Sequence, residues 1–498
     1  MTESETADFA AAETSTATEK PKKSQKRNYS AARFDRTTAD WVTAATTTNQ
    51  VLRSNLRWLR QRSRDLARND PYAKKFLRLV KSNVIGQGIK LQCKTTDKTL
   101  ATDAKLTSAV EKAFKEWTKK KNCTLSGKLS WLESQKLFAT YIARDGEAIV
   151  RLIFTNKNRF GFALKFYSPQ WLDETYNDTL PNGNRVIMSV EVDDDDCPQG
   201  YWLTPPVADY QARRKSHLYR FRVPANEIIH SFFASDDEDQ TRGVPALHAS
   251  MLRLKMLDGF EEAEVIAARV EACQMGFAIP PKDEIPEMTD SEDEDGNQIR
   301  VEESIEPGVI RELPAGYDFK TFDPKHPNPN AGEFKKTVLR GAAAGAEISY
   351  HTLAGDLEAV NYSSARIGML DDRDVWTEFQ TFVIENLCDI IFPIWLESAF
   401  LSGALEISVK DLRRLEPVFR ARGWTWVDPK KEADAHVVGL QNKFETLTDV
   451  LAEKGVDLED HLETLKKEKE LAKKYDIDLE EIYNPKKTAD KPAADSAN

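Results

Sequence analysis

Two runs of consecutive acidic residues are the part of this 498-residue chain whose composition could do chemistry. Asp193 to Asp196 and Asp236 to Asp239 each place four carboxylates in a row, and paired carboxylates can hold the two metal ions of a nuclease centre. Such centres usually take single carboxylates from separate strands, because neighbouring residues of one strand point to opposite faces. We therefore expect a solvated loop at each run, with a divalent-metal-dependent nucleic-acid-processing enzyme as the alternative.

Other residue types that do chemistry are not arranged for it. The seven histidines include no pair three to five residues apart, and the five cysteines form no CxxC pair. There is no GxSxG nucleophile motif and no P-loop, and Gly86-x-Gly88 lacks the third glycine of a dinucleotide fingerprint. The sequence predicts no catalytic residue, no cofactor, no metal site and no disulfide framework, which fits a reducing compartment.

The charge balance limits the possible partners. Lys and Arg total 70 against 81 Asp and Glu, a formal net charge of −11. This argues against a protein that holds nucleic acid through an overall basic surface, although weak contact with DNA is compatible with it. Met1 to Lys20 lacks the apolar core of a signal peptide, and charged residues interrupt the apolar stretch from Phe379 to Leu405. We expect a cytoplasmic origin and no membrane span.

The first half of the chain predicts an α+β fold. A polar arm over residues 1–42 precedes a helix expected over 49–67 and a second helix that begins at Pro71. Strands are expected where apolar residues alternate or run together, at 147–154, 161–167, 185–192 and 227–233. This block should form a mostly antiparallel sheet beside helices.

Arginines surround the leucines of the helix expected over 49–67. The face includes Arg57, Arg60, Arg64 and Arg68. Such a face could meet phosphates, or it could pair with carboxylates of a neighbouring subunit. Since the whole chain is acidic, we favour the subunit.

An unusually long helix is expected after Gly243-Val244-Pro245. Its apolar positions include Leu247, Met251 and Leu254, and the helical pattern continues to about Gln274. At 1.5 Å per residue, about 30 residues span about 45 Å, so this helix must pack against something outside a small core. An acidic, proline-containing insert over 280–306 follows it, which we expect to be a loop.

A second helix is expected from about Gly332, with a run of small residues that includes Gly341 and Gly345. Glycine in a helix interior costs about 1 kcal/mol relative to alanine, so this run predicts the close approach of another backbone. A third long helix should run from Ser364 to about Leu387.

The loop expected over 351–364, between these two helices, is predicted to move. Gly355 gives its backbone freedom, and its charges are Asp356 and Glu358, with His351 as the only possible cation.

Trp424-x-Trp426, closer to the C-terminus, could stack on bases, but a buried aromatic corner is the favoured interpretation. Two or three helices are expected to follow, over 433–452 and 458–474.

At five places the sequence resembles the lambda-type portal proteins of tailed phages. The matching stretches run in the expected order: Leu59 to Asn69, Val84 to Ile89, Gln240 to Leu247, Asp356 with Val360 to Arg366, and Trp424 to Pro429. Together they cover roughly residues 29–482. Ala344 to Tyr350 departs from the Gly-Leu-Gly-x-x-Tyr-like stretch that is common in the family, which concerns the local helix-to-loop geometry.

The resemblance implies a multi-domain portal fold that forms rings. Its parts would be a disordered N-terminal arm (1–42), an α+β wing (43–242), a first stem helix (243–276), a clip (277–331), a second stem helix (332–350), a tunnel loop (351–364), a long helix returning to the wing (365–423), a helical crown (424–482) and a disordered tail (483–498).

The resemblance also implies a function. A homo-dodecameric ring at the unique vertex of the virion head would pass double-stranded DNA during packaging and ejection. It would dock the terminase large subunit and a head-tail adaptor, contact the major capsid or scaffold protein, and assemble in the host cytoplasm. A net-negative channel suits this role, because fixed cations would hold the sliding phosphates. A structural adaptor without a DNA channel is a further alternative.

Two sets of residues are implied as sites. The tunnel loop and DNA channel would use His351, Asp356, Glu358, Asn361, Tyr362, Ser363 and Ser364. The stem would use Leu247, Met251, Leu254, Gly341 and Gly345.

Overall fold

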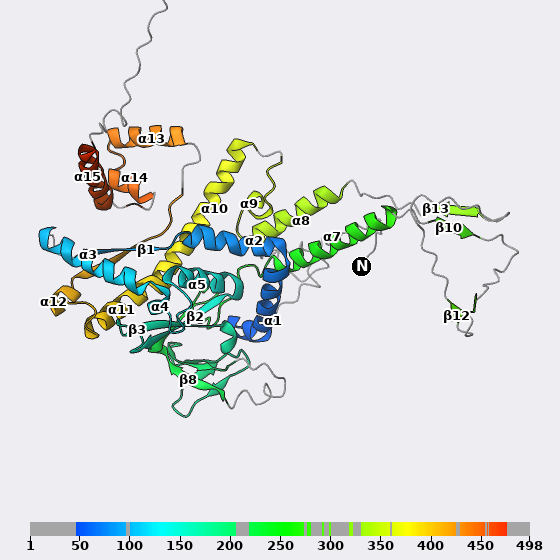
Figure 1. Ribbon diagram of the computed structural model, residues 1–498. Helices are drawn as coiled ribbons and strands as arrows, with labels where there is room; N and C mark the ends of the chain where they lie inside the picture. The colour runs from blue at the N-terminus through cyan, green and yellow to red at the C-terminus, as the bar shows by residue number, and fades with distance from the viewer. Residues whose placement is uncertain are drawn as a thin grey trace, which may run out of the picture. The chain divides into compact units, whose positions relative to one another are not determined.

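The computed structural model of the chain describes residues 46–95, 100–205, 219–272, 276–279, 291–292, 298–299, 318–321, 330–358, 361–424, 429–453, 456 and 458–475. The chain divides into two units, Met1–Thr47 and Thr48–Asn498, and the second holds all the elements below (Figure 1). Some expected features lie outside the described residues: the arm over 1–42, most of the insert over 277–331, Trp426 and the tail over 483–498.

Two helices and a π-helical turn open the second unit. Helix α1 (Thr48–Asn69) confirms the helix expected over 49–67. Asp70 then caps α2 (Pro71–Val80), because its carboxylate accepts the Ala73 N–H at 2.6 Å. The π-helical turn η2 (Lys81–Ile85) continues α2 and ends at Gly86, which has a φ of 56°. Three further helices cover the sheet: α3 (Leu100–Trp117), α4 (Lys120–Cys123) and α5 (Trp131–Asp145).

Strand β2 (Glu147–Phe154) lies at the centre of a three-stranded antiparallel sheet. Its neighbours are β3 (Phe162–Tyr167) and β9 (Ile228–Phe232). These strands confirm three of the four expected ones. The first four residues of β2 are all buried, as both faces of this strand are covered.

A second antiparallel sheet of five strands follows the chain order β4-β5-β6-β7-β8. Its strands are β4 (Asp178–Thr179), β5 (Arg185–Ile187), β6 (Val190–Val192), β7 (Pro198–Leu203) and β8 (Phe221–Pro224). The single strand expected over 185–192 is wrong, because it is a hairpin: Met188 and Ser189 have φ of 47° and 71°. A two-residue turn with both φ values positive reverses the chain tightly and matches the strand twist.

The structure also contains three two-stranded antiparallel ribbons. In the first, β1 (Lys90–Thr95) pairs with β14 (Leu415–Arg420). In the second, β10 (Gly276–Ile279) pairs with β13 (Asp318–Thr321), on either side of the insert expected over 280–306. In the third, β11 (Ser291–Glu292) pairs with β12 (Gln298–Ile299) inside that insert, which corrects the loop expected there. Single 3-10 turns, η3 (Pro169–Trp171) and η5 (Ala225–Glu227), connect other elements.

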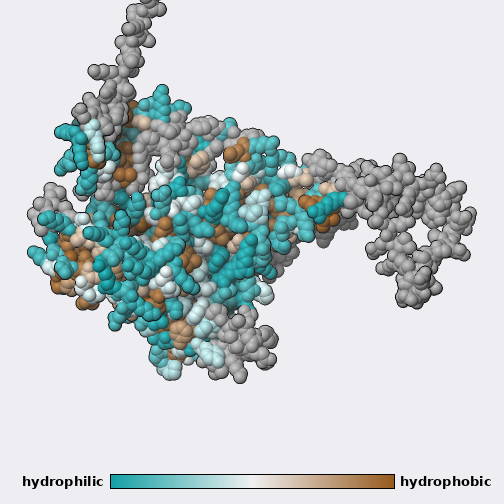
Figure 2. Space-filling model, in the orientation of Figure 1, coloured by the Kyte–Doolittle hydropathy of each residue, from teal (hydrophilic) through white to brown (hydrophobic). Residues whose placement is uncertain are grey.

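The remaining elements are helical. They are α7 (Met251–Ala272), α8 (Ala331–Gly345), α9 (Tyr350–Ala354), α10 (Tyr362–Val383), η6 (Ile384–Cys388), α11 (Asp389–Leu401), α12 (Val409–Leu412), α13 (Pro429–Gln441), α14 (Leu447–Glu453) and α15 (Leu458–Lys474). The last three confirm the helices expected near the C-terminus. Figure 2 shows that the visible surface is mostly hydrophilic, with hydrophobic residues in small separate groups.

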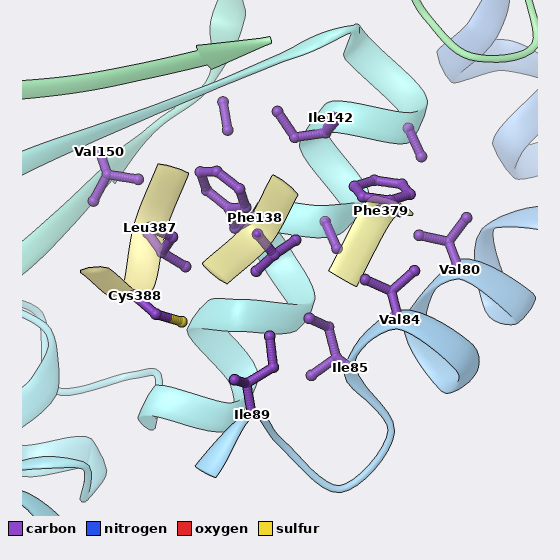
Figure 3. Packing of buried hydrophobic residues seen from close by; sticks show 14 of the residues in the cluster. Val80, Val84, Ile85, Ile89, Phe138, Ile142, Val150, Phe379, Leu387 and Cys388 are labelled. Atoms are coloured by element: carbon purple, nitrogen blue, oxygen red, sulfur yellow. The ribbon is translucent and has the colours of Figure 1, made fainter. Parts of the chain in front are cut away.

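Elements α10, η6 and α11 form one continuous helix, which extends past the expected end at Leu387 and contains Pro393. By length and composition alone, Arg366–Leu401 could cross a membrane, and half of its most apolar window is buried. Figure 3 shows Phe379 and Leu387 of this helix packed beside Phe138 of α5 and Val80 of α2. This packing is that of a core helix, which forms the centre of the main hydrophobic cluster.

Two glycines bring distant backbones together next to the central sheet. A Cβ on Gly146, which has a φ of 87°, would overlap the carbonyl carbons of Gly243 and Val244, and a Cβ on Gly243 would overlap the Gly146 carbonyl. Only glycine permits this approach. Arg242 precedes Gly243 and Glu147 follows Gly146, so the close approach of the two glycines places Arg242 next to Glu147.

The Glu147 carboxylate is the centre of a buried ion cluster. It accepts hydrogen bonds from Arg60 Nη2 at 2.6 Å, from Arg242 Nη2 at 2.6 Å and from the ring of His230 at 3.0 Å. Arg242 also donates to the Met188 carbonyl at 2.7 Å, which supports the tight hairpin turn. Glu147 and Arg242 are completely buried, so the cluster ties α1, the two sheets and the chain before α7 together.

The cluster keeps Glu147 ionised. Burial alone would raise the pKa of Glu147, but the charges of Arg242 and Arg60 outweigh it and hold the pKa well below its usual range. Burial lowers the pKa of His230, which favours a neutral ring.

Replacing Glu147 by Gln would leave two buried guanidinium groups without their shared anion. We expect Glu147→Gln to reduce the free energy of unfolding by about 3–5 kcal/mol, measured by chemical denaturation. The matched control is Glu227→Gln, which breaks the more exposed Arg151–Glu227 pair and should cost less than about 1 kcal/mol. Equal losses of unfolding free energy in the two variants would show that the buried cluster stabilises the fold no more than an exposed ion pair does.

Candidate functional site

Helices α7 and α8 form an antiparallel pair, with the expected insert between them in sequence. Ser250, just before α7, donates from its hydroxyl to the Ala342 carbonyl at 2.6 Å, and Phe260 packs against Phe334 with ring centroids 4.8 Å apart. Lys335 forms an ion pair with Glu261 at 2.5 Å. As the residue number rises along α7, the number of its partner on α8 falls.

The start of the long helix differs from the expectation. Residues 246–250 form turns, and α7 begins at Met251 instead of following Pro245 directly. Leu247, Met251 and Leu254 are buried in the main hydrophobic cluster of their own chain. The need for an external partner therefore does not come from these three residues.

The small residues of α8 allow the pair to pack closely. A Cβ on Gly345 would lie 2.6 Å from the Ser250 hydroxyl and 3.4 Å from the Ala249 carbonyl carbon. This confirms the predicted backbone approach at Gly345. At Gly341 the close neighbour is a side chain, because a Cβ there would overlap the guanidinium of Arg253.

The segment after α8 is partly helical, which corrects the loop expected over 351–364. Asp372 of α10 caps the short helix α9: its carboxylate accepts from the Ser349 N–H at 2.6 Å, from the Ser349 hydroxyl at 2.9 Å and from the Thr352 hydroxyl. Asp372 is only 4% exposed. Sequence reasoning missed it, because its acidic neighbours Asp371 and Asp374 are exposed and the three look alike in sequence.

The charged and polar residues of this segment are largely engaged within it. Asp356 accepts from the Tyr350 hydroxyl at 2.8 Å and from the Glu358 N–H at 2.9 Å, and the Tyr350 hydrogen bond lowers the pKa of Asp356. The His351 ring contacts the Asp356 carbonyl at 2.9 Å. Asn361 caps α10 by accepting from the Ser364 N–H at 2.8 Å. These contacts join the residues of the segment to one another, and its motion stays a prediction.

Only a few of the described polar side chains of this segment are exposed to solvent without a partner inside the segment. Glu358 is exposed and lies 3.5 Å from Lys336, and Ser363 and Ser364 are exposed at the start of α10. The Tyr362 side chain lies outside the described part.

Two lysines stand beside this segment, so His351 is not its only cation. One is Lys336 of α8; the other is Lys75 of α2, whose ammonium would lie 2.6 Å from a Cβ on Gly355. Burial lowers the pKa of Lys75, and the charge of Arg78 lowers it further. Lys336 belongs to the preceding helix and Lys75 to a helix distant in sequence, so the loop's own residues could not reveal them.

The arginine face of α1 divides into two groups. Arg60 binds Glu147, and Arg64 forms a bidentate pair with Asp145 at 2.6 and 3.0 Å. Both partners belong to the same chain, which corrects the expectation of a phosphate or a neighbouring subunit at these two positions. Arg57 and Arg68 are exposed.

The acidic runs lie in exposed turns. Asp193 accepts from the N–H groups of Asp195 and Cys197 at 3.1 and 2.9 Å, and Asp196 pairs with Arg185 at 2.8 Å. Within the described ranges, no three His, Cys, Asp or Glu residues gather in a way that could hold a metal ion. Trp424 packs partly buried against the main cluster, in line with an aromatic corner.

Comparison with known proteins gives a consistent match. A family model described as phage portal protein, lambda family, matches residues 34–380. A probable portal protein of Halomonas phage phiHAP-1 is 35% identical over 438 residues, 87% of this chain and 84% of the relative. Portal protein B of Escherichia phage lambda is 23% identical over 441 residues, 80% of this chain and 81% of the relative.

A solved structure, the neck of an empty gene transfer agent (GTA) particle, covers 79% of this chain and 93% of its own at 14% identity, with a TM-score of 0.43.

The capping role of Asp372 can be tested by hydrogen exchange. In Asp372→Ala, we expect the amides of residues 349–355 to exchange at least tenfold faster, because three hydrogen bonds to one buried carboxylate are lost. The control is Glu358→Gln, an exposed change in the same segment that should leave this exchange within about twofold. Unchanged protection in Asp372→Ala would contradict the capping role.

Proposed function

This chain belongs to the lambda family of phage portal proteins, and we propose that it forms a dodecameric ring through which double-stranded DNA is packaged and ejected. The observation that carries the ring is an unpartnered apolar stripe on α7. Leu252 and Met256 are 67% and 66% exposed, and Ile266 is 51% exposed. Exposed Gly259 and Ala263 lie between them on the same helical face.

The stripe has the composition of a helix–helix contact. Long apolar side chains at both ends would bury surface, while glycine and alanine in the middle let a second helix approach closely. A Cβ on Gly259 would meet nothing within 4 Å among the described residues. In a heterologous contact each copy offers this stripe to a different surface of the next copy, and a constant rotation closes the ring.

The expected parts of a portal are proposed as a working map. The α7–α8 pair would be the stem, the insert between its helices (277–331) the clip, residues 351–364 the tunnel segment and the helices of 424–482 the crown. The block over 43–242 and the long helix over 365–423 would form the wing. The antiparallel α7–α8 pairing supports this map, because it brings both ends of the insert to one end of the stem.

Partners follow from the same proposal. The clip would dock the terminase large subunit and later the head-tail adaptor, and the wing would contact the major capsid or scaffold protein. The ring would sit at the portal vertex of the virion after assembly in the host cytoplasm. We assign no catalytic residue and no cofactor to the ring, because a channel through which DNA passes needs neither.

The stripe on α7 predicts the effect of a charge within it. Met256→Asp should reduce ring formation at least tenfold, because an exposed methionine that is buried in the ring would be replaced by a carboxylate that must lose its water. Native mass spectrometry of the purified chain measures the ring population against the 56.4 kDa monomer. The control Asp258→Asn changes an exposed residue on another face of α7 and should assemble normally. Normal rings in Met256→Asp would remove the stripe from the subunit contact.

The tunnel segment predicts a salt-dependent effect on DNA. Glu358 is the exposed carboxylate of this segment, so Glu358→Lys would add one cation per subunit beside Lys336 and turn weak repulsion of phosphate into attraction. Rings should form as in the wild type, while packaging slows at low salt and recovers at high salt, because exposed charges are screened over about 8–10 Å. Packaging that is unchanged across salt concentrations would mean that residues 351–364 do not face the DNA.

A further inference from the structure

The long core helix carries a stripe of carboxylates on its outer side. Asp374, Glu378, Glu385 and Asp389 are all exposed and follow one another at intervals of four, seven and four residues. These intervals keep side chains close to one helical face, opposite the buried Phe379, Val383 and Leu387. We name these four residues the acidic stripe.

The acidic stripe has no counter-charge among the residues that the structure describes. None of its four carboxylates forms an ion pair or a hydrogen bond within the described part of the structure. Burial raises the pKa of Asp389, and the charge of Glu385 raises it further. A cation placed along this face would relieve that repulsion.

Helix α1 carries a basic stripe with the same intervals. Arg53, Arg57, Arg64 and Arg68 are also spaced by four, seven and four residues, along the edge of the buried face of α1, where buried Arg60 lies between Arg57 and Arg64. Asp145 already binds Arg64, which leaves Arg53, Arg57 and Arg68 exposed and without a carboxylate among the described residues. Both stripes span 16 residues, and the 15 steps from first to last cover about 22 Å of helix.

We propose that, in the ring of the proposed function, the basic stripe of α1 in one copy docks along the acidic stripe of α10–α11 in the next copy. The two stripes have opposite charge, equal length and equal spacing, and among the described residues the four carboxylates and three of the four arginines have no ion-pair partner. They lie on different elements (Figure 1), as a head-to-tail contact requires. The intervals of four, seven and four residues are the same from either end of a stripe. Opposite charges can therefore face each other whether the two helices run parallel or antiparallel.

A second copy is a better occupant of the basic stripe than DNA phosphate. DNA would satisfy the arginines but would leave the carboxylates of α10–α11 without cations. The chain is also acidic overall, with a net charge of −11, so acidic surface on a neighbouring copy is plentiful. Only contact between copies neutralises both stripes at once.

The test uses two charge-reversed chains. Variant A is Arg53→Glu with Arg68→Glu, and variant B is Asp374→Arg with Asp389→Arg, so the two end residues of each stripe are reversed and face each other in either direction of crossing. Each variant alone sets like charges against each other at every contact, so the concentration needed for half-assembly at about 0.15 M salt should rise at least tenfold. In an equimolar mixture every A–B contact again joins opposite charges. Native mass spectrometry should then show rings with equal numbers of A and B.

Control variants separate this contact from general charge effects. Arg62→Glu lies on another face of α1, and Asp194→Lys lies in an exposed turn; both should assemble like the wild type. Thermal unfolding of all variants checks that the monomers fold, and variant A and variant B should each unfold within about 3 °C of the wild type.

The outcomes distinguish this contact from the ring itself. Rings of A or B alone at wild-type concentrations, or a mixture of folded A and B that stays unassembled while the wild type forms rings, would overturn the contact only. If variant A assembled normally but lost DNA retention, the arginines would belong to phosphate and the contact would be wrong. A wild-type chain that forms no ring would overturn the proposed function together with this contact.

Discussion

The carboxylate of Glu147 is the interaction on which the rest of the structure depends. Two guanidinium groups and one imidazole reach it from α1, from the chain before α7 and from β9. A buried anion with several charged donors is costly to lose, because each donor would be left desolvated without its partner. The cluster therefore holds the chain just before the α7–α8 pair against the two sheets.

Local periodicity made much of this fold predictable. Helices α1, α8 and α13–α15 and strands β2, β3 and β9 follow patterns of apolar residues that are set within each segment. The hairpin at Met188 and Ser189 was not predictable in the same way, because neither residue favours a positive φ. Its turn is stabilised by Arg242 and Asn177 from other elements, so tertiary contacts overrule the local preference.

Charged residues were harder to place than apolar ones. An arginine stripe on a helix looks the same whether its partners are inside the chain or outside it, and Arg60 and Arg57, three residues apart, have opposite environments. Asp372 and Asp374 show the same ambiguity on α10. The pairing of β1 with β14 depends on contacts between residues more than 300 positions apart. Burial decides all these cases, and burial is a property of the whole fold.

Apolar and charged stripes would contribute differently to a ring. Apolar burial is non-directional and tolerates sliding along the stripe, so the exposed face of α7 alone would hold two copies together without setting their register. Charges at matched intervals penalise a shifted register, because a displaced helix would set like charges side by side. Exposed ion pairs add little stability each, typically about 0.2–1 kcal/mol, which suits a contact that selects register while the apolar stripe supplies adhesion. A closed ring needs this selection more than an open dimer does, because a small error of rotation at each contact accumulates around the circle and prevents closure.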